Sequence, residues 1–108
     1  MARMGEELSE LGRFAEPALL ILVSLAGGDK HGYAMIEDIE QLSRMRLGPG
    51  TLYGALARLE RRGWIEALQS DDRRRPYRLT GAGASALREQ LTGMRELAVA
   101  GLQRLATT

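Results

Sequence analysis

Apolar residues in the first part of the chain recur with the spacing of α-helices. The pattern predicts a short leading helix over Glu6–Phe14, a second helix over Pro17–Ala26 and a third over Tyr33–Leu42. The helix over Pro17–Ala26 is apolar nearly all round, and such a helix must be covered on most of its sides. Because a chain of 108 residues has little material for that cover, we expect a second subunit to supply part of it.

The third predicted helix has one apolar face, and its other positions are largely acidic. The residues of the apolar face are Met35, Ile36, Ile39 and Leu42. The acidic positions are Glu37, Asp38 and Glu40. We expect these acids to be solvated, because they lie away from the apolar face.

A fourth helix is predicted to open at Gly48-Pro49-Gly50 and to run to Arg62. Gly48 can serve as its N-cap, and Pro49 suits the first helical position, where the missing N–H costs nothing. Gly63 supplies the left-handed residue that often follows a helix. The buried stripe is predicted to be Leu52, Leu56 and Leu59. The outward face is predicted to carry Gly50, Gly54, Ala57, Arg58 and Arg61.

After Gly63 the apolar residues alternate, which is typical of strands. Trp64–Leu68 is predicted to form one strand and Pro76–Leu79 the returning strand of a β-hairpin, with a polar turn over 69–75 between them. Pro76 suits the first residue of a strand or an edge position.

A long helix is predicted from Thr80 to the end of the chain. Thr80 can serve as its N-cap, but Gly83 stands where a capping box would have Glu or Gln, so the start is weaker. One apolar stripe runs along the helix at steps of three and four, and it consists of Leu87, Leu91, Met94, Ala98, Leu102 and Leu105. The domain has nothing left to cover this stripe, which predicts pairing with a second copy of the chain.

The composition excludes several kinds of chemistry. The chain has no cysteine, which excludes disulfides, thiolate metal sites and cysteine nucleophiles, and its single histidine, His31, argues against a histidine metal site. No catalytic motif is found, so we expect no enzyme activity, no cofactor and no metal. The longest apolar run is far shorter than the roughly 20 residues of a membrane helix. With no signal-peptide pattern at the N-terminus, we expect a cytoplasmic protein without a membrane partner.

Charge is distributed unevenly along the chain, although the net charge is only +1. Between positions 42 and 78 there are nine arginines and four acids, whereas the rest has six basic and ten acidic residues. A basic middle suggests one face directed at a polyanion. An ordinary mixed surface would explain the charge equally well.

The order of the predicted elements says more about fold and function than the charge does. Two successive helices followed by a basic hairpin are the layout of a winged helix-turn-helix, in which the second helix of the pair enters the major groove of DNA. We therefore expect a mainly α fold with a small β-hairpin and a long C-terminal dimerisation helix. Residues 1–79 would form the DNA-binding part and residues 80–108 the dimerisation helix, both within one compact unit.

Several side chains are candidates for contacts to DNA. The free N–H groups at Gly50 and Thr51 can hold a phosphate, the Thr51 and Tyr53 hydroxyls can reach phosphates or bases, and Arg58 can reach a guanine or a phosphate. The alternatives are a capping role for the glycines, a half-buried core position for Tyr53 and a solvated Arg58.

The predicted turn of the hairpin and His31 offer further candidates. Arg73, Arg74 and Arg75 are favoured as contacts to the DNA backbone, although they could pair internally with the preceding acids of the turn. His31 is expected at a helix start, where it would contact phosphate or act as a cap.

Residues from Ala15 to about Leu105 resemble the PadR family of bacterial transcriptional regulators. The segments that carry the resemblance are Ala18-Leu19-Leu20-Ile21-Leu22, His31-Gly32-Tyr33, Pro49-Gly50-Thr51-Leu52-Tyr53, Gly63-Trp64-Ile65 and Tyr77-Arg78-Leu79-Thr80. The resemblance implies a homodimeric regulator of the repressor type that binds a near-palindromic operator. By position it implies DNA contacts from His31, Tyr33, the block Pro49–Tyr53 and the wing arginines.

The same resemblance implies how the dimer forms. Members of the family pair through the C-terminal helix, packed with N-terminal helices, which implies dimer contacts from Leu19 and Leu22 together with the stripe from Leu87 to Leu105. Some compact members bind flat aromatic drugs through a tryptophan on the last helix. Residues 80–108 contain no aromatic side chain, so an effector pocket here would be aliphatic.

Two other functions stay open at the level of sequence. The acidic pair Asp71-Asp72 beside the wing fits a protein-interaction module that keeps the winged fold and lacks DNA binding. An apolar pocket at the dimer interface would make the protein a regulator gated by a small apolar compound.

Overall fold

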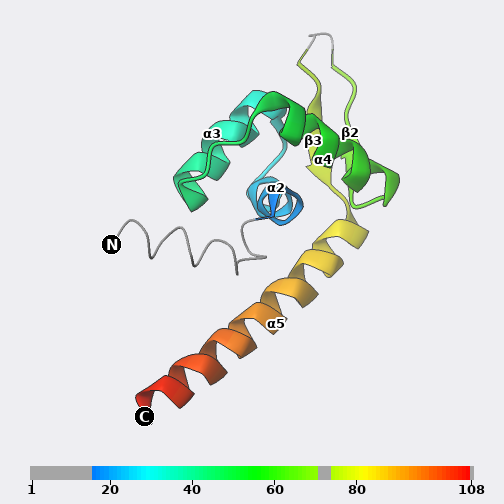
Figure 1. Cartoon of the computed structure of the whole chain (residues 1–108). Coiled ribbons are helices and arrows are strands. Elements are labelled where there is room, and N and C mark those ends of the chain that lie inside the picture. The colour runs from blue at the N-terminus through cyan, green and yellow to red at the C-terminus, as the bar shows by residue number, and fades with distance from the viewer. Residues whose placement is uncertain (1–15, 71–73, 108) are drawn as a thin grey trace.

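The computed structural model describes residues 16–70 and 74–107. The elements in chain order are α2 (Pro17–Ala26), β1 (Lys30–His31), α3 (Gly32–Ser43), α4 (Pro49–Arg61), β2 (Ile65–Ala67), β3 (Pro76–Leu79) and α5 (Gly81–Ala106). The predicted leading helix over Glu6–Phe14 lies outside the described residues. The fold class is confirmed: three helices and a small sheet form the body, and a long helix leaves it (Figure 1).

Helix α2 is the centre of the core. It packs against α3, α4, α5 and β3, so the predicted need for cover on most sides is met largely within the chain. Four apolar residues of α2, Leu20, Ile21, Leu22 and Leu25, are buried. They meet a cluster from the other elements that includes Met35, Ile36, Ile39, Leu47, Leu52, Ala55, Leu56, Leu59, Ile65 and Leu87.

One residue of the predicted core face of α3 is not in the core. Leu42 is 56% exposed, whereas Met35 and Ile39 are fully buried. Leu42 lies in the last turn of α3, which projects beyond α2 (Figure 1). Helical spacing assigns a face, but it does not say where along the helix the core ends.

Two of the three acids of α3 have ion-pair partners. Asp38 accepts a hydrogen bond of 2.6 Å from the Ser24 hydroxyl and lies 3.8 Å from the Lys30 ammonium. Glu40 pairs with Arg46 at 2.5 Å. The prediction of a solvated acidic face is therefore wrong for Asp38, because Ser24 and Lys30 are partners that helical spacing does not reveal. Glu40 is solvated as predicted, since 45% of its side chain is exposed in the surface pair with Arg46.

The sheet has three antiparallel strands in the order β1-β3-β2, one more than the predicted hairpin. The additional strand β1 pairs Lys30 with Tyr77 and His31 with Pro76. Pro76 is therefore the first residue of the central strand rather than of an edge strand. The two residues of β1 are too few to show alternation, which is why the sequence pattern missed this strand.

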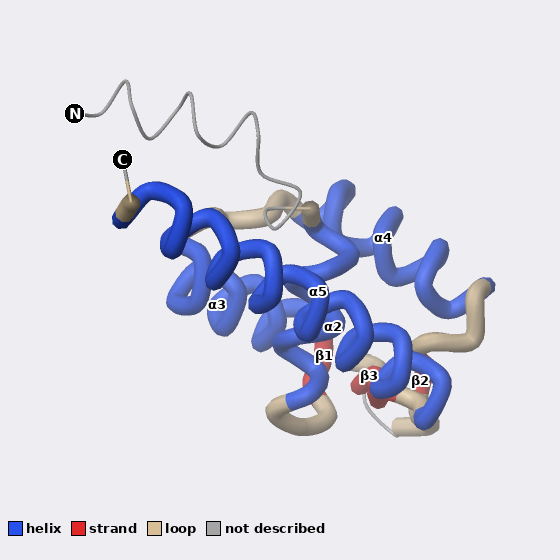
Figure 2. Tube along the Cα trace, turned by 90° about the horizontal axis from the view of Figure 1, so that it is seen from below, coloured by secondary structure: helices blue, strands red, loops and turns tan. Residues whose placement is uncertain are grey.

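Helix α5 starts on the sheet and then leaves the body. Its N-cap is Thr80, as predicted, and the Thr80 side chain accepts a hydrogen bond of 3.0 Å from the Gly83 N–H. Figure 2 shows the first half of α5 passing over α2, which it contacts. Beyond that contact the apolar stripe is open, and Leu102 and Leu105 are 68% and 71% exposed.

Candidate nucleic-acid interface

Helix α4 presents one apolar and one open face, as its sequence predicts. Gly48 is the N-cap, Pro49 is the first helical residue, and Gly63 follows the helix with a φ of 76°. The buried residues are Leu52, Ala55, Leu56 and Leu59. The exposed ones include Pro49, Gly50, Thr51, Tyr53, Ala57, Arg58 and Arg61. Small residues on this face would let the helix backbone approach the edges of bases closely.

A cavity of about 580 Å³ lies between the start of α4 and the wing, which is the hairpin from β2 to β3. Seven residues line it: His31, Gly32, Tyr33, Tyr53, Arg74, Arg75 and Tyr77. We call this cavity the tyrosine cup. It brings together five predicted site residues from β1, α3, α4 and the wing. Arg58 lies further along α4 and does not line the cup, and Arg73 is outside the described residues.

His31 acts as a helix cap. It is the N-cap of α3, and its Nδ1 accepts a hydrogen bond of 3.3 Å from the backbone N–H of Ala34. The capping half of the prediction is therefore confirmed. The imidazole also lines the tyrosine cup, where a phosphate contact would have to be made.

Tyr33 and Tyr53 are surface residues, with exposed fractions of 58% and 53%. A core position for Tyr53, the alternative that the sequence left open, is wrong. Both phenol rings border the cup from neighbouring helices, so their hydroxyls are accessible to a ligand from outside.

Tyr77 is a member of the cup that was not among the predicted site residues. It is half-buried on β3, and this burial raises the pKa of its hydroxyl. Glu60 and Tyr53 add to the rise, whereas Arg75 opposes it. The hydroxyl therefore stays protonated at neutral pH and can donate to a phosphate oxygen. The signal in the sequence that could have pointed to Tyr77 is the alternation along β3, which turns Tyr77 and Arg78 to opposite faces.

The basic side chains around the site divide into paired and unpaired groups. Arg78 pairs with Asp29 at 3.1 Å, Arg46 with Glu40, and the Arg62 guanidinium lies 5.0 Å from the centre of the Trp64 ring. Within residues 16–70 and 74–107, no acidic side chain lies within ion-pair distance of the guanidinium groups at positions 58, 74 and 75. Their charge is available to an external anion.

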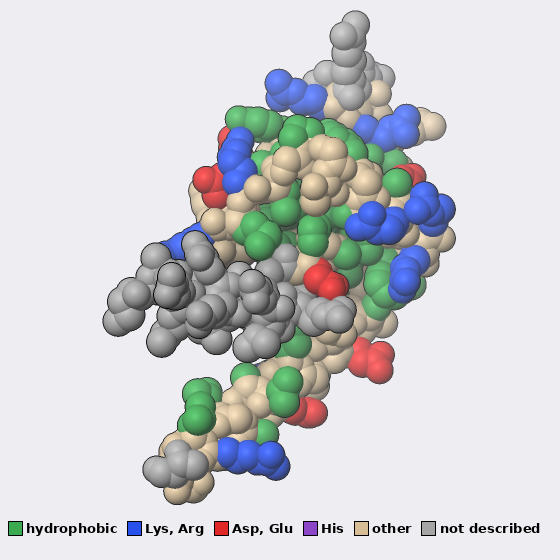
Figure 3. Space-filling model, in the orientation of Figure 1, with side chains coloured by type: hydrophobic (Ala, Val, Ile, Leu, Met, Phe, Trp, Pro, Cys, Tyr) green, Lys and Arg blue, Asp and Glu red, His purple; other side chains and the backbone are tan. Residues whose placement is uncertain are grey.

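Figure 3 shows where these charges gather on the surface. In the half of the molecule that holds the wing and α4, Lys and Arg side chains lie on both sides with a few acidic side chains among them. Arg46, in the connection between α3 and α4, extends this basic surface, and the sequence reasoning did not select it. The adjacent Glu40 carboxylate holds the pKa of Arg46 above its usual value, so Arg46 is charged at any physiological pH.

The described residues also lack a membrane-spanning helix and a metal site. Among residues 16–70 and 74–107, no helix is long and apolar enough to cross a membrane. No group of three or more acidic or histidine side chains within those ranges has the arrangement of a metal site.

The fold and the site define a winged helix-turn-helix protein. Residues 21–89 match the model of the transcriptional regulator PadR-like family. The chain belongs to this family, which consists of transcriptional regulators rather than enzymes.

Individual relatives agree with this assignment. The transcriptional regulator Rv3488 of Mycobacterium tuberculosis is 40% identical over 83 residues, which cover 74% of this chain and 77% of that protein. An uncharacterized 37.1 kDa protein in transposon TN4556 of Streptomyces fradiae is 42% identical over 107 residues. That match covers 89% of this chain, but the chain spans only 31% of the Streptomyces protein.

A solved structure shares the fold over most of its length. The PadR family transcription regulator from hypervirulent Clostridium difficile R20291 superposes with a TM-score of 0.75 at 27% sequence identity. The match covers 84% of this chain and 99% of that chain. The long C-terminal helix and the wing therefore belong to a known architecture.

Proposed function

We propose that this chain binds duplex DNA in a sequence-specific way through α4, the tyrosine cup and the wing, and thereby regulates transcription. The observation that carries the proposal is that Arg74 and Arg75, which have no acidic partner among residues 16–70 and 74–107, line the cup together with Tyr53 from the exposed face of α4. The major groove of B-DNA, about 12 Å wide, admits a helix of this kind. A polyanion would meet donors from both sides of the cup.

Within this proposal each group of residues has its own role. Gly50, with Gly54 and Ala57, lets α4 approach the base edges next to Pro49, and the free N–H groups of Gly50 and Thr51 face a phosphate. His31, Tyr33 and Tyr53 contact phosphates or bases at the cup. Arg58 reaches a guanine or a phosphate, and the wing arginines Arg73, Arg74 and Arg75 hold the flanking backbone.

The proposal includes a homodimer that reads a near-palindromic operator. Its support is the exposure of the apolar stripe of α5, in which Leu91, Ala98, Leu102 and Leu105 are exposed and Met94 is partly exposed. Leu22 and Leu87 are buried in the chain's own core. With Leu19 they border a groove between α2 and α5. Among the predicted dimer contacts, Leu22 and Leu87 therefore have the least surface left for a second copy. Residues 80–108 would form the dimerisation helix and residues 1–79 the DNA-reading part of one compact unit.

Repression is the proposed direction of regulation, because occupying a promoter requires DNA binding alone and no further contact with polymerase. A promoter fusion tests this direction. Reporter output should fall when the chain is expressed and recover when Arg74 and Arg75 are changed to alanine. Output that rises with expression would contradict repression while leaving DNA binding intact.

Fluorescence anisotropy with labelled duplexes tests DNA binding itself. Binding should weaken as salt increases, with a slope of about −0.9 in log–log form for each phosphate contact. No binding to any duplex at low salt would contradict the proposal. It would favour the protein-interaction module that the acids at 71 and 72 suggest.

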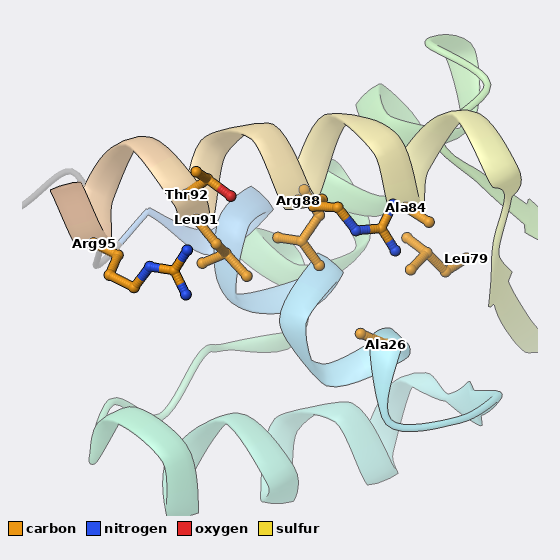
Figure 4. Close-up of a pocket in the computed structure, with 8 residues that line it drawn as sticks. Ala26, Leu79, Ala84, Arg88, Leu91, Thr92 and Arg95 are labelled. Carbon is orange, nitrogen blue, oxygen red and sulfur yellow. The ribbon is translucent and has the colours of Figure 1, made fainter.

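A groove of about 470 Å³ between the end of α2 and α5 favours a second candidate function, regulation by a small molecule. Leu79, Ala84, Leu87 and Leu91 supply apolar lining, and Arg88, Thr92 and Arg95 stand along α5 beside them (Figure 4). A compound bound there would touch both the core helix of the DNA-reading part and the dimerisation helix. Thermal shift against a compound panel tests this: a ligand should raise Tm, and Leu91→Asp should remove that rise.

A further inference from the structure

Gly32, which was not among the predicted site residues, lies in unusually close contact with Tyr53. A Cβ atom built on Gly32 would lie 2.6 Å from the Tyr53 Oη, 3.0 Å from its Cζ and 3.1 Å from a methyl group of Leu52. All three atoms belong to α4, whereas Gly32 is the buried first residue of α3. The two helices of the DNA-reading pair therefore meet at a point where only glycine leaves room for the tyrosine.

The backbone conformation of Gly32 does not itself require glycine. Its φ lies outside the positive range in which other residues are strained. The space occupied by the end of the Tyr53 side chain is therefore the structural reason for a glycine at this position.

Tyr53 has no other anchor in the described part of the chain. Its hydroxyl makes no hydrogen bond to a residue within 16–70 or 74–107, and 53% of the residue is exposed. An exposed tyrosine without a polar partner is held in one position only by what its ring packs against. The end of the Tyr53 ring lies close to the backbone of Gly32, directly beside His31 and Tyr33 in the cup.

We propose that Gly32 is a positioning residue for DNA binding, because it provides the seat that holds Tyr53 against α3 with its hydroxyl at the tyrosine cup. This inference rests on the proposed DNA contact of Tyr53. A methyl group at position 32 displaces the Tyr53 ring outward, because the ring end is exposed and free to move. The Leu52 methyl group needs to shift by only a few tenths of an ångström.

A double-mutant cycle tests the proposal with a labelled duplex selected from a random pool. Tyr53→Ala and Gly32→Ala should each weaken binding about tenfold, the effect of roughly one lost contact. In the Tyr53→Ala chain, adding Gly32→Ala should change Kd by less than about twofold, because the displaced group is already gone. Gly81→Ala is the matched control, since Gly81 is also the first residue of a helix but has open space around its Cα.

If Gly32→Ala folds poorly, measurements of Tm still test the proposal. Removal of the Tyr53 ring makes room for the methyl group, so the double variant should have a Tm at least equal to that of Tyr53→Ala. A Gly32→Ala chain that binds DNA as the unchanged chain does would overturn the proposal. Equal losses from Gly32→Ala with and without Tyr53 would overturn it too. If Tyr53→Ala alone leaves binding unchanged, the proposed DNA contact of Tyr53 is wrong. The Tm comparison then still tests whether the Tyr53 ring occupies the space beside Gly32.

Discussion

The backbone of Gly83 at the start of α5 lies directly against the carbonyl oxygen of Trp64, so that a methyl group on residue 83 would overlap that oxygen. Hydrogen bonds of Thr80 hold the same junction. Its N–H donates to the Trp64 carbonyl at 3.0 Å, its hydroxyl donates to the Gly63 carbonyl at 2.6 Å and accepts from the Gly83 N–H. The long helix is thus joined rigidly to the residues that directly precede the wing.

We expect Gly83→Ala to destabilise the protein by about 2–3 kcal/mol, the usual cost of overpacking a tight contact. The obstacle is a backbone carbonyl, which cannot move aside as a side chain can. Urea unfolding followed by circular dichroism measures the change. Gly93→Ala is the control, because Gly93 lies in α5 with open space around it and should gain up to about 1 kcal/mol. Equal stability of the two variants would contradict the close contact.

The link between α2 and α3 should contribute measurably to stability. Ser24 is 1% exposed, and its hydroxyl donates to Asp38. Ser24→Ala should cost about 1 kcal/mol, because the Asp38 carboxylate loses one donor but keeps Lys30 and access to water. Ser85→Ala, at an exposed position of α5, should leave the unfolding midpoint unchanged. A neutral Ser24→Ala would show that water replaces the hydroxyl at no cost.

The wing arginines should act on every DNA sequence alike. Changing both Arg74 and Arg75 to alanine should weaken binding to specific and random duplexes by a similar factor, because phosphate contacts carry no base information. The slope of log K against log salt should flatten by about 0.9 for each lost contact. Arg104→Ala removes the same charge from the far end of α5 and should leave the slope unchanged. A loss confined to one sequence would assign these arginines to base recognition instead.

The dimer should depend on the open part of the α5 stripe. Leu102→Glu places a charge on an apolar position that is 68% exposed in the single chain, so it should dissociate the dimer without unfolding the protein. Sedimentation velocity at micromolar concentration measures the change. Gln103→Glu adds a charge on the next residue, away from the stripe, and should leave the dimer intact. A folded monomer before any substitution would contradict the homodimer.

Much of the fold could be predicted from local signals in the sequence. The predicted bounds of α2 and β3 match those in the structure, because Pro17 and Gly27 delimit the helix and Pro76 is the first residue of the strand. Strand β1 was missed, since its pairing with β3 joins residues far apart in the chain. The exposure of Leu42 was also missed, because it depends on where α2 and α4 end.

The sequence predicted which residues belong to the candidate site, but not how they are arranged in space. His31, Tyr33, Tyr53 and the wing arginines were selected, but their meeting in one cup depends on the packing of α3 against α4. Tyr77 was left out because alternation along β3 gives its face of the strand but not the cup that this face borders. Gly83 was interpreted as a weak helix start, although the contact with Trp64 shows that a larger residue has no room there.

Selection of bound duplexes from a random pool tests the central claim most directly, namely that the surface from His31 to Leu79 binds DNA by sequence. The account predicts convergence on one motif made of two related half-sites about one or two helical turns apart, as a two-fold dimer requires. The selected duplex should lose affinity when Tyr53 or the wing arginines are replaced. A pool that stays random after repeated rounds at moderate salt would contradict sequence-specific binding by this chain.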